Sequence, residues 1–305
     1  MSYHIVNIDD PKVCISCRQG QLCCTDSSGN VRSLPMEDVA SVVITSFSPV
    51  LHGEFLSRAA EFGIAVILCK NFQPVSILMP ANRSSDTLLT KAFVYLDERR
   101  SENLWQKTVD AKCANQLFAA TLYTDNFGDL KKLSIANTMK CVEKESVCAR
   151  YYWQLFGAAV GDKSFNRVIR QGGANDLLNF GYVMLTSVVL QKLFAYGLDP
   201  SFGIGHKIRE RAAPLAYDIM EPFRVFIDLG VVKWIKMGED AVVDTAFKRF
   251  ITKSMLNKVP YMDESLDLSR CIEKVVGSFR RAIKEKDNRY YKPWTGLNSK
   301  WDGCL

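Results

Sequence analysis

The hydrophobic pattern of this 305-residue chain changes near residue 80. Before that point, short apolar segments alternate with turn signals such as Asp-Pro, Gln-Gly and Ser-Ser-Gly-Asn, which is typical of strands. After it, apolar residues recur every three or four positions, which predicts helices. Residues 81–86 between them have the composition of a linker. We therefore expect an α+β fold, with a β-rich, sandwich-like domain over residues 1–80 and a larger all-α domain over residues 87–305.

The first region is expected to be mostly antiparallel, with one helix at about 51–62 that ends at Gly63. Its predicted strands are 4–8, 13–17, 22–26, 31–34, 39–45, 64–69 and 75–79. The clearest predicted helices of the second region are 87–99, 103–120, 141–160 and 175–196. The last of these is apolar on nearly every side, which places it at the centre of a helical bundle.

Composition and charge exclude several protein classes. Apolar residues make up 48% and charged residues 24%, so a disordered or fibrous chain is excluded. The longest apolar stretch, residues 180–190, is shorter than the roughly 20 residues that cross a bilayer. Asp9 and Asp10 stand where a signal peptide would be apolar. We expect a cytoplasmic protein with no membrane association.

The net charge of +6 is unevenly distributed. Residues 1–85 contain six Lys and Arg against seven Asp and Glu, which leaves 33 basic and 26 acidic residues in 86–305. A basic second region hints at nucleic acid, although scattered bases on a solvated surface produce the same excess.

Ten cysteines, including the pair Cys14 and Cys17, raise the question of a zinc site. The pair lies in a predicted strand, where residues three apart point to opposite faces. Because no second such pair follows, we reject zinc here.

Glu145 is a charge within an apolar helical stripe. Val142, Ala149, Tyr152 and Phe156 share its face at spacings of three and four. A carboxylate in that position requires a cation, a hydrogen-bond network or a raised pKa. A structural salt bridge to a neighbouring helix is the simpler alternative.

Two further places contain ionisable residues in unusual surroundings. His206 follows a loop rich in Gly and Pro that can bring backbone close to a ligand, although a lone histidine is more often a hydrogen-bonding residue. Asp218 and Glu221 share a helix face and repel each other unless a cation lies between them. Pro222 disfavours helical geometry at Glu221 and predicts a kink there.

Together, a Glu, a His and an Asp/Glu pair suggest a site for a hard divalent metal, Mg²⁺ or Mn²⁺. The neighbouring segments are rich in bases, which suits a phosphodiester substrate. These bases are Lys163, Arg167, Arg170, Lys207, Arg209, Arg211 and Arg224.

Four segments occur in an order typical of one family: residues 145–153, 165–167 with 175–182, 197–206, and 218–224. Together they resemble the CRISPR-associated integrase of the spacer-acquisition machinery. The segment that begins Lys112-Cys-Ala-Asn-Gln and the β-then-α order also fit. The motif Asp218-Ile-Met-Glu-Pro-Phe-Arg is most similar to the corresponding sequence in members from type II systems.

The resemblance implies a metal-dependent DNA integrase and endonuclease that inserts protospacer DNA into a CRISPR array. It implies a homodimer, formed through the N-terminal β domain, which joins a small ferredoxin-like partner dimer in a heterohexamer. Carried over by position, Glu145, His206 and Glu221 correspond to the metal ligands of the family. Asp218 corresponds to a nearby acid that either ligates or supports a ligand.

The implied reaction is transesterification, in which a protospacer 3′-hydroxyl attacks a phosphodiester of the repeat. Arg224 is the candidate to hold phosphate or stabilise the leaving oxygen. The candidate DNA-binding residues besides Arg224 are Asn166, Arg167, Arg170, Lys207 and Arg209.

Two other functions stay open: a metal-dependent nuclease that hydrolyses branched or single-stranded DNA, and a non-catalytic DNA-binding scaffold whose acids form salt bridges. The stretch 280–294, which mixes bases with aromatic residues, suits either DNA binding or an exposed amphipathic helix.

Overall fold

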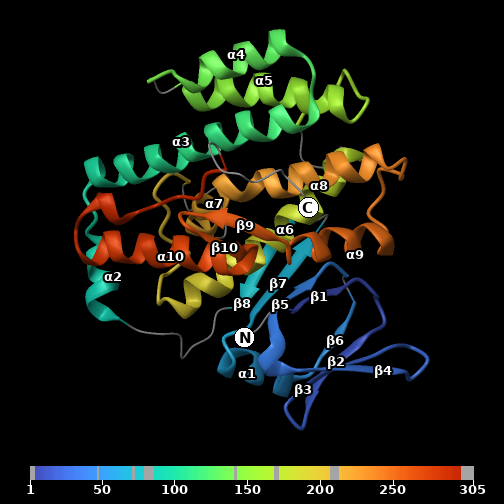
Figure 1. The fold of residues 1–305 in the computed structure, drawn as a ribbon. Helices are drawn as coiled ribbons and strands as arrows, with labels where there is room; N and C mark the ends of the chain where they lie inside the picture. Colours follow the sequence, from blue (N-terminus) through green and yellow to red (C-terminus); the bar gives the residue numbers. More distant parts are fainter. Residues whose placement is uncertain are drawn as a thin grey trace.

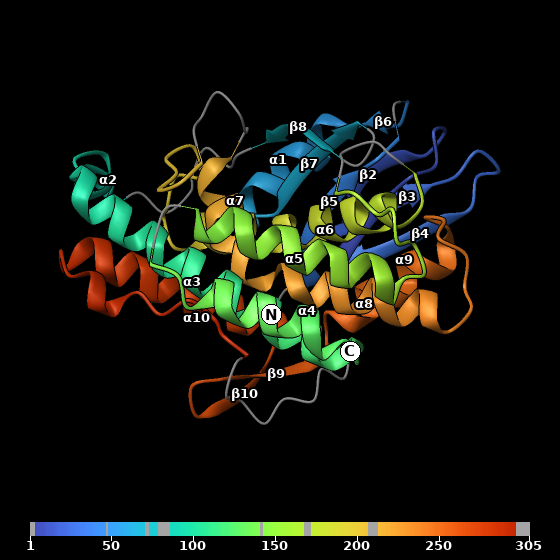
Figure 2. The ribbon, with the colours of Figure 1, turned by 90° about the horizontal axis from the view of Figure 1, so that it is seen from above.

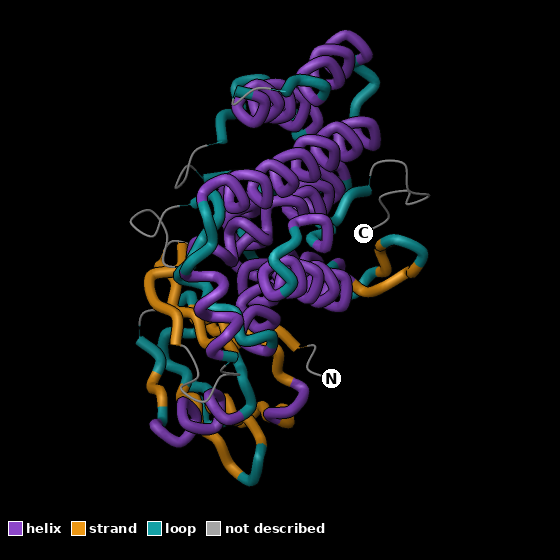
Figure 3. Tube along the Cα trace, turned by 90° about the vertical axis from the view of Figure 1, so that its left-hand side faces the viewer, coloured by secondary structure: helices purple, strands orange, loops and turns teal. Residues whose placement is uncertain are grey.

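The computed structural model describes residues 4–46, 48–70, 73–78, 86–140, 143–167, 172–206 and 213–296. A strand-rich N-terminal region is followed by a larger helical region, which confirms the predicted fold class (Figure 1). Figure 3 shows most strands gathered at one end of the molecule and the helices filling the rest.

The described N-terminal region contains two four-stranded sheets. The first has the order β1 (His4–Ile8), β5 (Val39–Ile44), β7 (Ala65–Lys70), β8 (Gln73–Leu78). The second has the order β4 (Val31–Pro35), β3 (Gln21–Thr25), β2 (Cys14–Arg18), β6 (Val50–Leu51). Their inner faces share a core with helix α1 (Gly53–Glu61), to which β2 contributes Ile15 and β5 contributes Val42.

The expectation of a mostly antiparallel region was met only in part, because three of the six described strand pairings are parallel. Strand β5 pairs in parallel with both β1 and β7, and β2 pairs in parallel with β6. Parallel neighbours need a long crossover. Helix α1 lies in the connection from β5 to β7, and the hairpins β2–β3–β4 fill the connection from β1 to β5.

The outer face of the first sheet is covered by helix α6 (Ala174–Ala195), which lies beside β5 in Figures 1 and 2. The Ser41 hydroxyl of β5 donates to the Ser187 hydroxyl of α6 at 2.8 Å. Along β5, Val42 belongs to the core between the sheets, whereas Val43 belongs to the core shared with the helices. This alternation joins the two regions through one buried strand.

Helix α6 confirms the predicted central helix. By length and composition it could cross a membrane, but 94% of its most apolar window is buried within the fold. The long helix α3 (Glu98–Tyr123) separates α6 from α4 (Phe127–Asn137) and α5 (Lys144–Ala159), which lie on its outer side (Figure 1). The other helices are α2 (Thr87–Val94), α7 (Pro214–Met220), α8 (Arg224–Lys236), α9 (Thr245–Ser254) and α10 (Leu268–Lys284).

Two local predictions were wrong. The helix expected over 87–99 is divided after Val94, because the Asp97 side chain accepts from the Arg100 N–H at 2.9 Å and begins α3. A hairpin, β9 (Lys258–Tyr261) with β10 (Glu264–Asp267), interrupts the helical region. Its strands are only four residues long and β9 contains Pro260, so neither produces a clear alternating pattern.

Candidate metal and phosphodiester site

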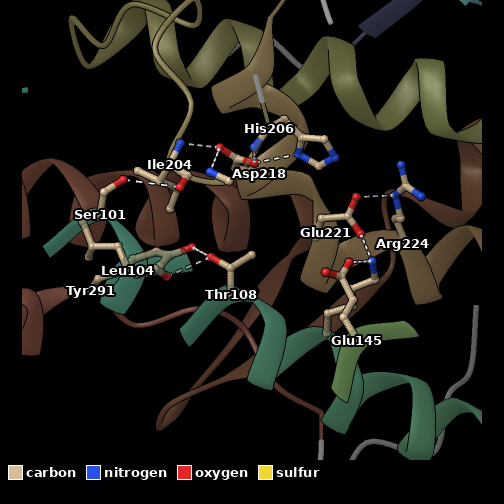
Figure 4. A network of polar contacts seen from close by, with 12 residues as sticks. Ser101, Leu104, Thr108, Glu145, Ile204, His206, Asp218, Glu221, Arg224 and Tyr291 are labelled. Atoms are coloured by element: carbon tan, nitrogen blue, oxygen red, sulfur yellow. Dashed lines mark hydrogen bonds and ion pairs between the residues drawn. The ribbon is translucent and has the colours of Figure 1, made fainter. Parts of the chain in front are cut away.

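Three helical segments bring a lysine and two carboxylates together, and the two acids, Glu145 and Glu221, are labelled in Figure 4. The Lys112 ammonium of α3 lies 2.6 Å from Glu145 Oε1 of α5 and 2.8 Å from Glu221 Oε2 at the end of α7. The side chains of Lys112 and Glu221 are 13% and 3% exposed, so this cation and this acid are withdrawn from solvent. The two predicted ligands from distant segments therefore converge on one positive charge.

Local chain geometry places Glu221 at a junction. A short 3₁₀ helix, η2 (Glu221–Phe223), connects α7 to α8, as the predicted kink at Pro222 requires. Glu221 itself keeps helical dihedral angles (φ −49°, ψ −46°), which corrects the expectation that the proline would exclude them. The Asn115 amide of α3 donates to the Pro222 carbonyl at 2.7 Å and so fastens the junction to the helix that carries Lys112.

Arg224 and Lys112 keep the buried Glu221 ionised. Burial alone would raise the pKa of Glu221, but the charges of Arg224 and Lys112 outweigh it and lower the pKa to about 2. His206 lies close enough to contribute to the same lowering. Arg224 Nε is 3.3 Å from Glu221 Oε1, and its guanidinium lies 4.7 Å from the Tyr182 ring centroid.

Asp218 holds the loop that carries His206 (Figure 4). One carboxylate oxygen, Oδ2, accepts from the backbone N–H groups of Ile204 and Gly205 at 2.6 and 3.0 Å. The other, Oδ1, accepts from the His206 N–H at 3.0 Å and from His206 Nδ1 at 2.7 Å. Because an ionised carboxylate only accepts hydrogen bonds, Nδ1 is the donor in this contact, and in a neutral imidazole the lone pair is then on Nε2.

This geometry revises the prediction that Asp218 and Glu221 share a cation. They are three residues apart, yet Asp218 faces the 204–206 backbone and Glu221 faces Lys112 and Arg224. The cation lies instead between Glu221 and Glu145.

Two glycines of the loop before His206, Gly203 and Gly205, allow close packing. A Cβ on Gly205 would lie 2.3 Å from the Trp105 ring, and one on Gly203 would lie 2.4 Å from the His206 carbonyl oxygen. The close backbone approach that the sequence suggested is therefore to Trp105 and to the loop itself.

The donor set fits a hard divalent cation. Two carboxylates and one imidazole nitrogen suit Mn²⁺ or Mg²⁺. Within the described ranges, no three His, Cys, Asp or Glu side chains already form a group that could hold a metal. The two carboxylates are instead brought together by Lys112, and the buried Glu221 Oε2 makes a charge contact without good hydrogen-bond geometry. This oxygen therefore has lone pairs that are not used in hydrogen bonds and could coordinate a metal.

Arg167 is the one predicted DNA-binding base outside this cluster that the structure describes. Its guanidinium donates to Asn175 Oδ1 at 2.8 Å and to Asn179 Oδ1 at 2.7 Å, so the side chain is folded onto α6. Asn166 is exposed, and its carbonyl accepts from the Asn175 amide at 2.9 Å. The predicted residues Arg170, Lys207 and Arg209 lie outside the described residues.

Three bases of the 280–294 stretch have partners within the chain. Helix α10 is amphipathic, with one face buried. Arg280 lies 3.2 Å from Asp86, Lys284 lies 3.9 Å from the same carboxylate, and Arg281 lies 4.0 Å from the Tyr290 ring centroid. Residues 280–284 thus belong to an amphipathic helix, whereas the rest of the stretch lies beyond the end of α10. Tyr291 and Trp294 are buried in the core, so neither aromatic ring is exposed for base stacking.

Sequence reasoning missed two parts of the site. Lys112 belongs to a segment that fits the family resemblance, but the sequence alone does not mark it as a residue of the site. Asp228 is buried in α8 and accepts from Tyr152 and Tyr182 at 2.6 and 2.5 Å. Burial raises the pKa of Asp228 to about 6, although both tyrosines oppose the rise. An aspartate within the apolar run 225–232 was the available signal.

Comparison with known proteins finds matches that cover most of the chain. Residues 6–258 match the family model described as CRISPR associated protein Cas1. The CRISPR-associated endonuclease Cas1 of Neisseria meningitidis serogroup C (strain 8013) is 25% identical over 272 residues, which cover 87% of this chain and 88% of that protein.

Two solved structures share the fold. A casposase bound to integration product superposes with a TM-score of 0.77 at 21% identity, covering 98% of this chain and 95% of that one. A chain of a Cas6-RT-Cas1–Cas2 complex superposes with a TM-score of 0.78 at 16% identity, covering 97% of this chain and 36% of that one.

Proposed function

This chain belongs to the CRISPR-associated Cas1 family, and from that premise we propose that it is a metal-dependent DNA integrase and endonuclease. Its substrates are protospacer DNA and the repeat of a CRISPR array. The observation that carries the proposal is the convergence of Glu145 and Glu221 on one cation, beside a histidine whose free nitrogen is set by Asp218.

Glu145, Glu221 and the Nε2 of His206 are the proposed ligands of Mg²⁺ or Mn²⁺. When bound there, the metal supplies positive charge that lowers the pKa of an attacking hydroxyl and neutralises charge on the phosphate. Asp218 keeps the imidazole in the tautomer that leaves Nε2 able to ligate. It is therefore a positioning residue in this proposal.

The proposed reaction exchanges one phosphodiester for another. The protospacer 3′-oxygen forms a bond to the phosphorus of the repeat, and the bond from that phosphorus to the repeat 3′-oxygen breaks. The proton of the attacking hydroxyl goes to the solvent, and the leaving oxygen takes one up. Arg224 donates to the phosphate oxygens, where charge increases in the transition state. For Arg167 to hold the DNA backbone as proposed, its guanidinium would exchange the Asn175 and Asn179 oxygens for phosphate oxygens.

The partners follow from the same family. We propose that the chain is a homodimer that dimerises through its β-rich region and joins a small ferredoxin-like partner dimer in a heterohexamer. The related folds include one named for its bound integration product and one named for a complex with Cas2, which supports DNA and a second Cas protein as partners. The proposed site of action is the cytoplasm.

Hydrolysis is the second candidate function, because the Neisseria relative is named an endonuclease. It would use the same residues with water in place of the 3′-hydroxyl.

A strand-transfer assay tests the proposal. Labelled DNA with a free 3′-hydroxyl is incubated with a supercoiled array plasmid and the protein, with Mg²⁺, Mn²⁺ or chelator. Glu145→Gln and His206→Ala are expected to lower joining at least about hundredfold, because each removes a metal ligand. Glu143→Gln is the matched control, since this exposed acid lies two residues before Glu145 at the start of α5.

Joined strands support the integrase, whereas cut strands alone support the hydrolytic nuclease. Activity that survives chelation, or that survives in Glu145→Gln, would refute the site. DNA binding without any strand chemistry would support the scaffold.

A further inference from the structure

We propose that Lys112 is an internal counter-cation, whose ammonium holds Glu145 and Glu221 together until a divalent metal binds both carboxylates. This inference rests on the proposed function, because it assigns a role to one more residue of the proposed metal site. It makes Lys112 a positioning residue and a competitor of the metal at the same time.

The geometry supports a bridge in which the Lys112 ammonium joins the two carboxylates. The ammonium contacts one oxygen of each acid, at 2.6 and 2.8 Å, and the acids come from different helices. The lysine side chain is only 13% exposed, so few water molecules can replace it. One turn further along α3, Asn115 holds the Pro222 carbonyl at 2.7 Å. The helix that carries the bridge is thus fastened beside Glu221.

The charges show why a bridge is needed. Two carboxylates at this separation repel each other when no cation lies between them. Arg224 contacts Glu221 on the opposite oxygen, Oε1, whereas Lys112 contacts both acids. Without Lys112, the cation that Glu145 and Glu221 share in this structure would be lost.

A divalent metal held by Glu145 and Glu221 would compete with Lys112 for the negative charge of both carboxylates. It also supplies more positive charge than the ammonium, which makes the bridge redundant once the metal is bound. Lys112 therefore keeps the metal-free site formed and, by the same contacts, weakens the binding of free metal. Removal of Lys112 would leave two carboxylates that repel each other. A divalent cation would relieve this repulsion on binding, so its affinity for the site would increase.

The test compares Mn²⁺ binding to the chelator-treated full-length protein and to its Lys112→Met variant, by isothermal titration calorimetry. We expect the variant to bind Mn²⁺ about tenfold more tightly, because the competing charge is gone. Its Tm in chelator should fall, and its rise in Tm on saturation with Mn²⁺ should exceed that of the unmodified protein. Lys112→Arg, which keeps the charge, should bind Mn²⁺ with the original affinity to within about threefold.

Lys107→Met is the matched control. Lys107 lies on the same helix and donates to the Asn288 and Tyr291 carbonyls at 2.6 and 3.3 Å, so its loss should lower Tm without tightening Mn²⁺ binding. Equal or weaker Mn²⁺ binding by Lys112→Met would overturn the inference. If that variant does not fold, Lys112→Gln takes its place with the same expected direction.

Glu145→Gln separates this inference from the proposed function. If the unmodified protein shows no Mn²⁺ binding that Glu145→Gln weakens, the metal site itself fails. If Glu145→Gln weakens binding but the neutral Lys112 variants do not tighten it, only the role of Lys112 fails.

Discussion

At the scale of single residues, the site depends on acids that are buried with their partners already in place. Asp218 uses both oxygens on the segment 204–206, and Glu221 uses both on cations. Breaking either set would leave an uncompensated charge inside the protein, which is far more costly than losing an exposed pair.

Asp218→Asn should weaken both folding and metal binding. The amide nitrogen replaces one accepting oxygen, so at least one backbone donor or His206 Nδ1–H loses its partner. We expect a loss of about 2–4 kcal/mol in the free energy of unfolding, measured by urea denaturation. We also expect a 10- to 100-fold loss of Mn²⁺ affinity, measured by calorimetry.

Asp199→Asn is the control for this variant, because Asp199 lies in the same loop and accepts from the Ser201 N–H at 2.9 Å. An Asp218→Asn protein with unchanged Mn²⁺ affinity would show that Asp218 does not position a ligand.

Asp228 should make stability depend on pH. Burial raises its pKa to about 6, above the value of about 3.9 expected in the unfolded chain. The folded state therefore favours the protonated acid, and that stabilisation is lost as the pH rises through 6. Relative to Asp228→Asn, the unmodified protein should lose about 1 kcal/mol of unfolding free energy between pH 5 and pH 7.

Urea denaturation of both proteins at several pH values measures this difference. The groups that interact with Asp228 include Tyr123, Tyr152, Tyr182 and the charges of Arg167 and Arg224. A difference that stays constant from pH 5 to pH 7 would contradict the raised pKa.

Sequence reasoning reached the acids of the site but not their shared cation. Glu145 and Glu221 were identifiable because a charge on an apolar face is unusual. Lys112 was not, since a lysine on a long helix is ordinarily solvated and gives no local signal. Only the crossing of α3 with α5 and with the α7–α8 junction shows that its ammonium is enclosed.

At the scale of elements, helices α6 and α8 pack closely against each other in the core. A Cβ on Gly181 of α6 would lie 2.3 Å from the Ile227 Cγ2 of α8. The two helices approach each other this closely because a glycine faces a branched side chain, and the contact leaves no room for an added methyl group.

Gly181→Ala should therefore destabilise the protein by about 1–3 kcal/mol, despite the better helix propensity of alanine. Ile227→Ala should cost about 2–5 kcal/mol through the cavity that it leaves. The double variant should cost less than the sum, because the shortened side chain makes room for the new methyl group. Urea denaturation of all three variants measures the coupling.

Gly128→Ala in α4 is the control, since its Cβ would meet only the Asn126 side chain at an ordinary 3.5 Å. It should leave stability unchanged or raise it slightly. Additive costs at Gly181 and Ile227 would contradict the close packing.

The secondary-structure elements also show what the periodicity of apolar residues can predict. Long helices with a regular apolar pattern, such as α5 and α6, were located correctly to within a few residues. The parallel pairing of β5 was not predicted, because strand partners are chosen by contacts between distant segments. The hairpin β9–β10 was missed for a different reason, since four-residue strands are too short to establish a period.

At the scale of the whole molecule, the two regions are not separated by solvent. Val43, Ala65 and Ile67 of the first sheet belong to the same buried cluster as the central residues of α6. Residues 81–85 of the predicted linker lie outside the described residues, and the described residues on either side of it contribute to one core.

We expect the full chain to unfold in one cooperative transition, because neither region can expose the shared core without cost. Differential scanning calorimetry should show one peak whose calorimetric and van't Hoff enthalpies agree. Helical circular dichroism and tryptophan fluorescence should follow the same curve. Two resolved peaks would show that the sheets and the helices unfold independently.

The attachment of His206 to Asp218 reduces the number of parts that must be aligned at the site. Asp218 lies in α7, and Glu221 follows about one turn later at the end of this helix. Because Asp218 holds the His206 imidazole, the position of α7 determines the positions of both the imidazole and the Glu221 carboxylate. A displacement of α7 would shift both of them as a unit, whereas Glu145 would stay with α5. The distance between these donors is therefore set by how α5 and the α7–η2 segment each pack against α3.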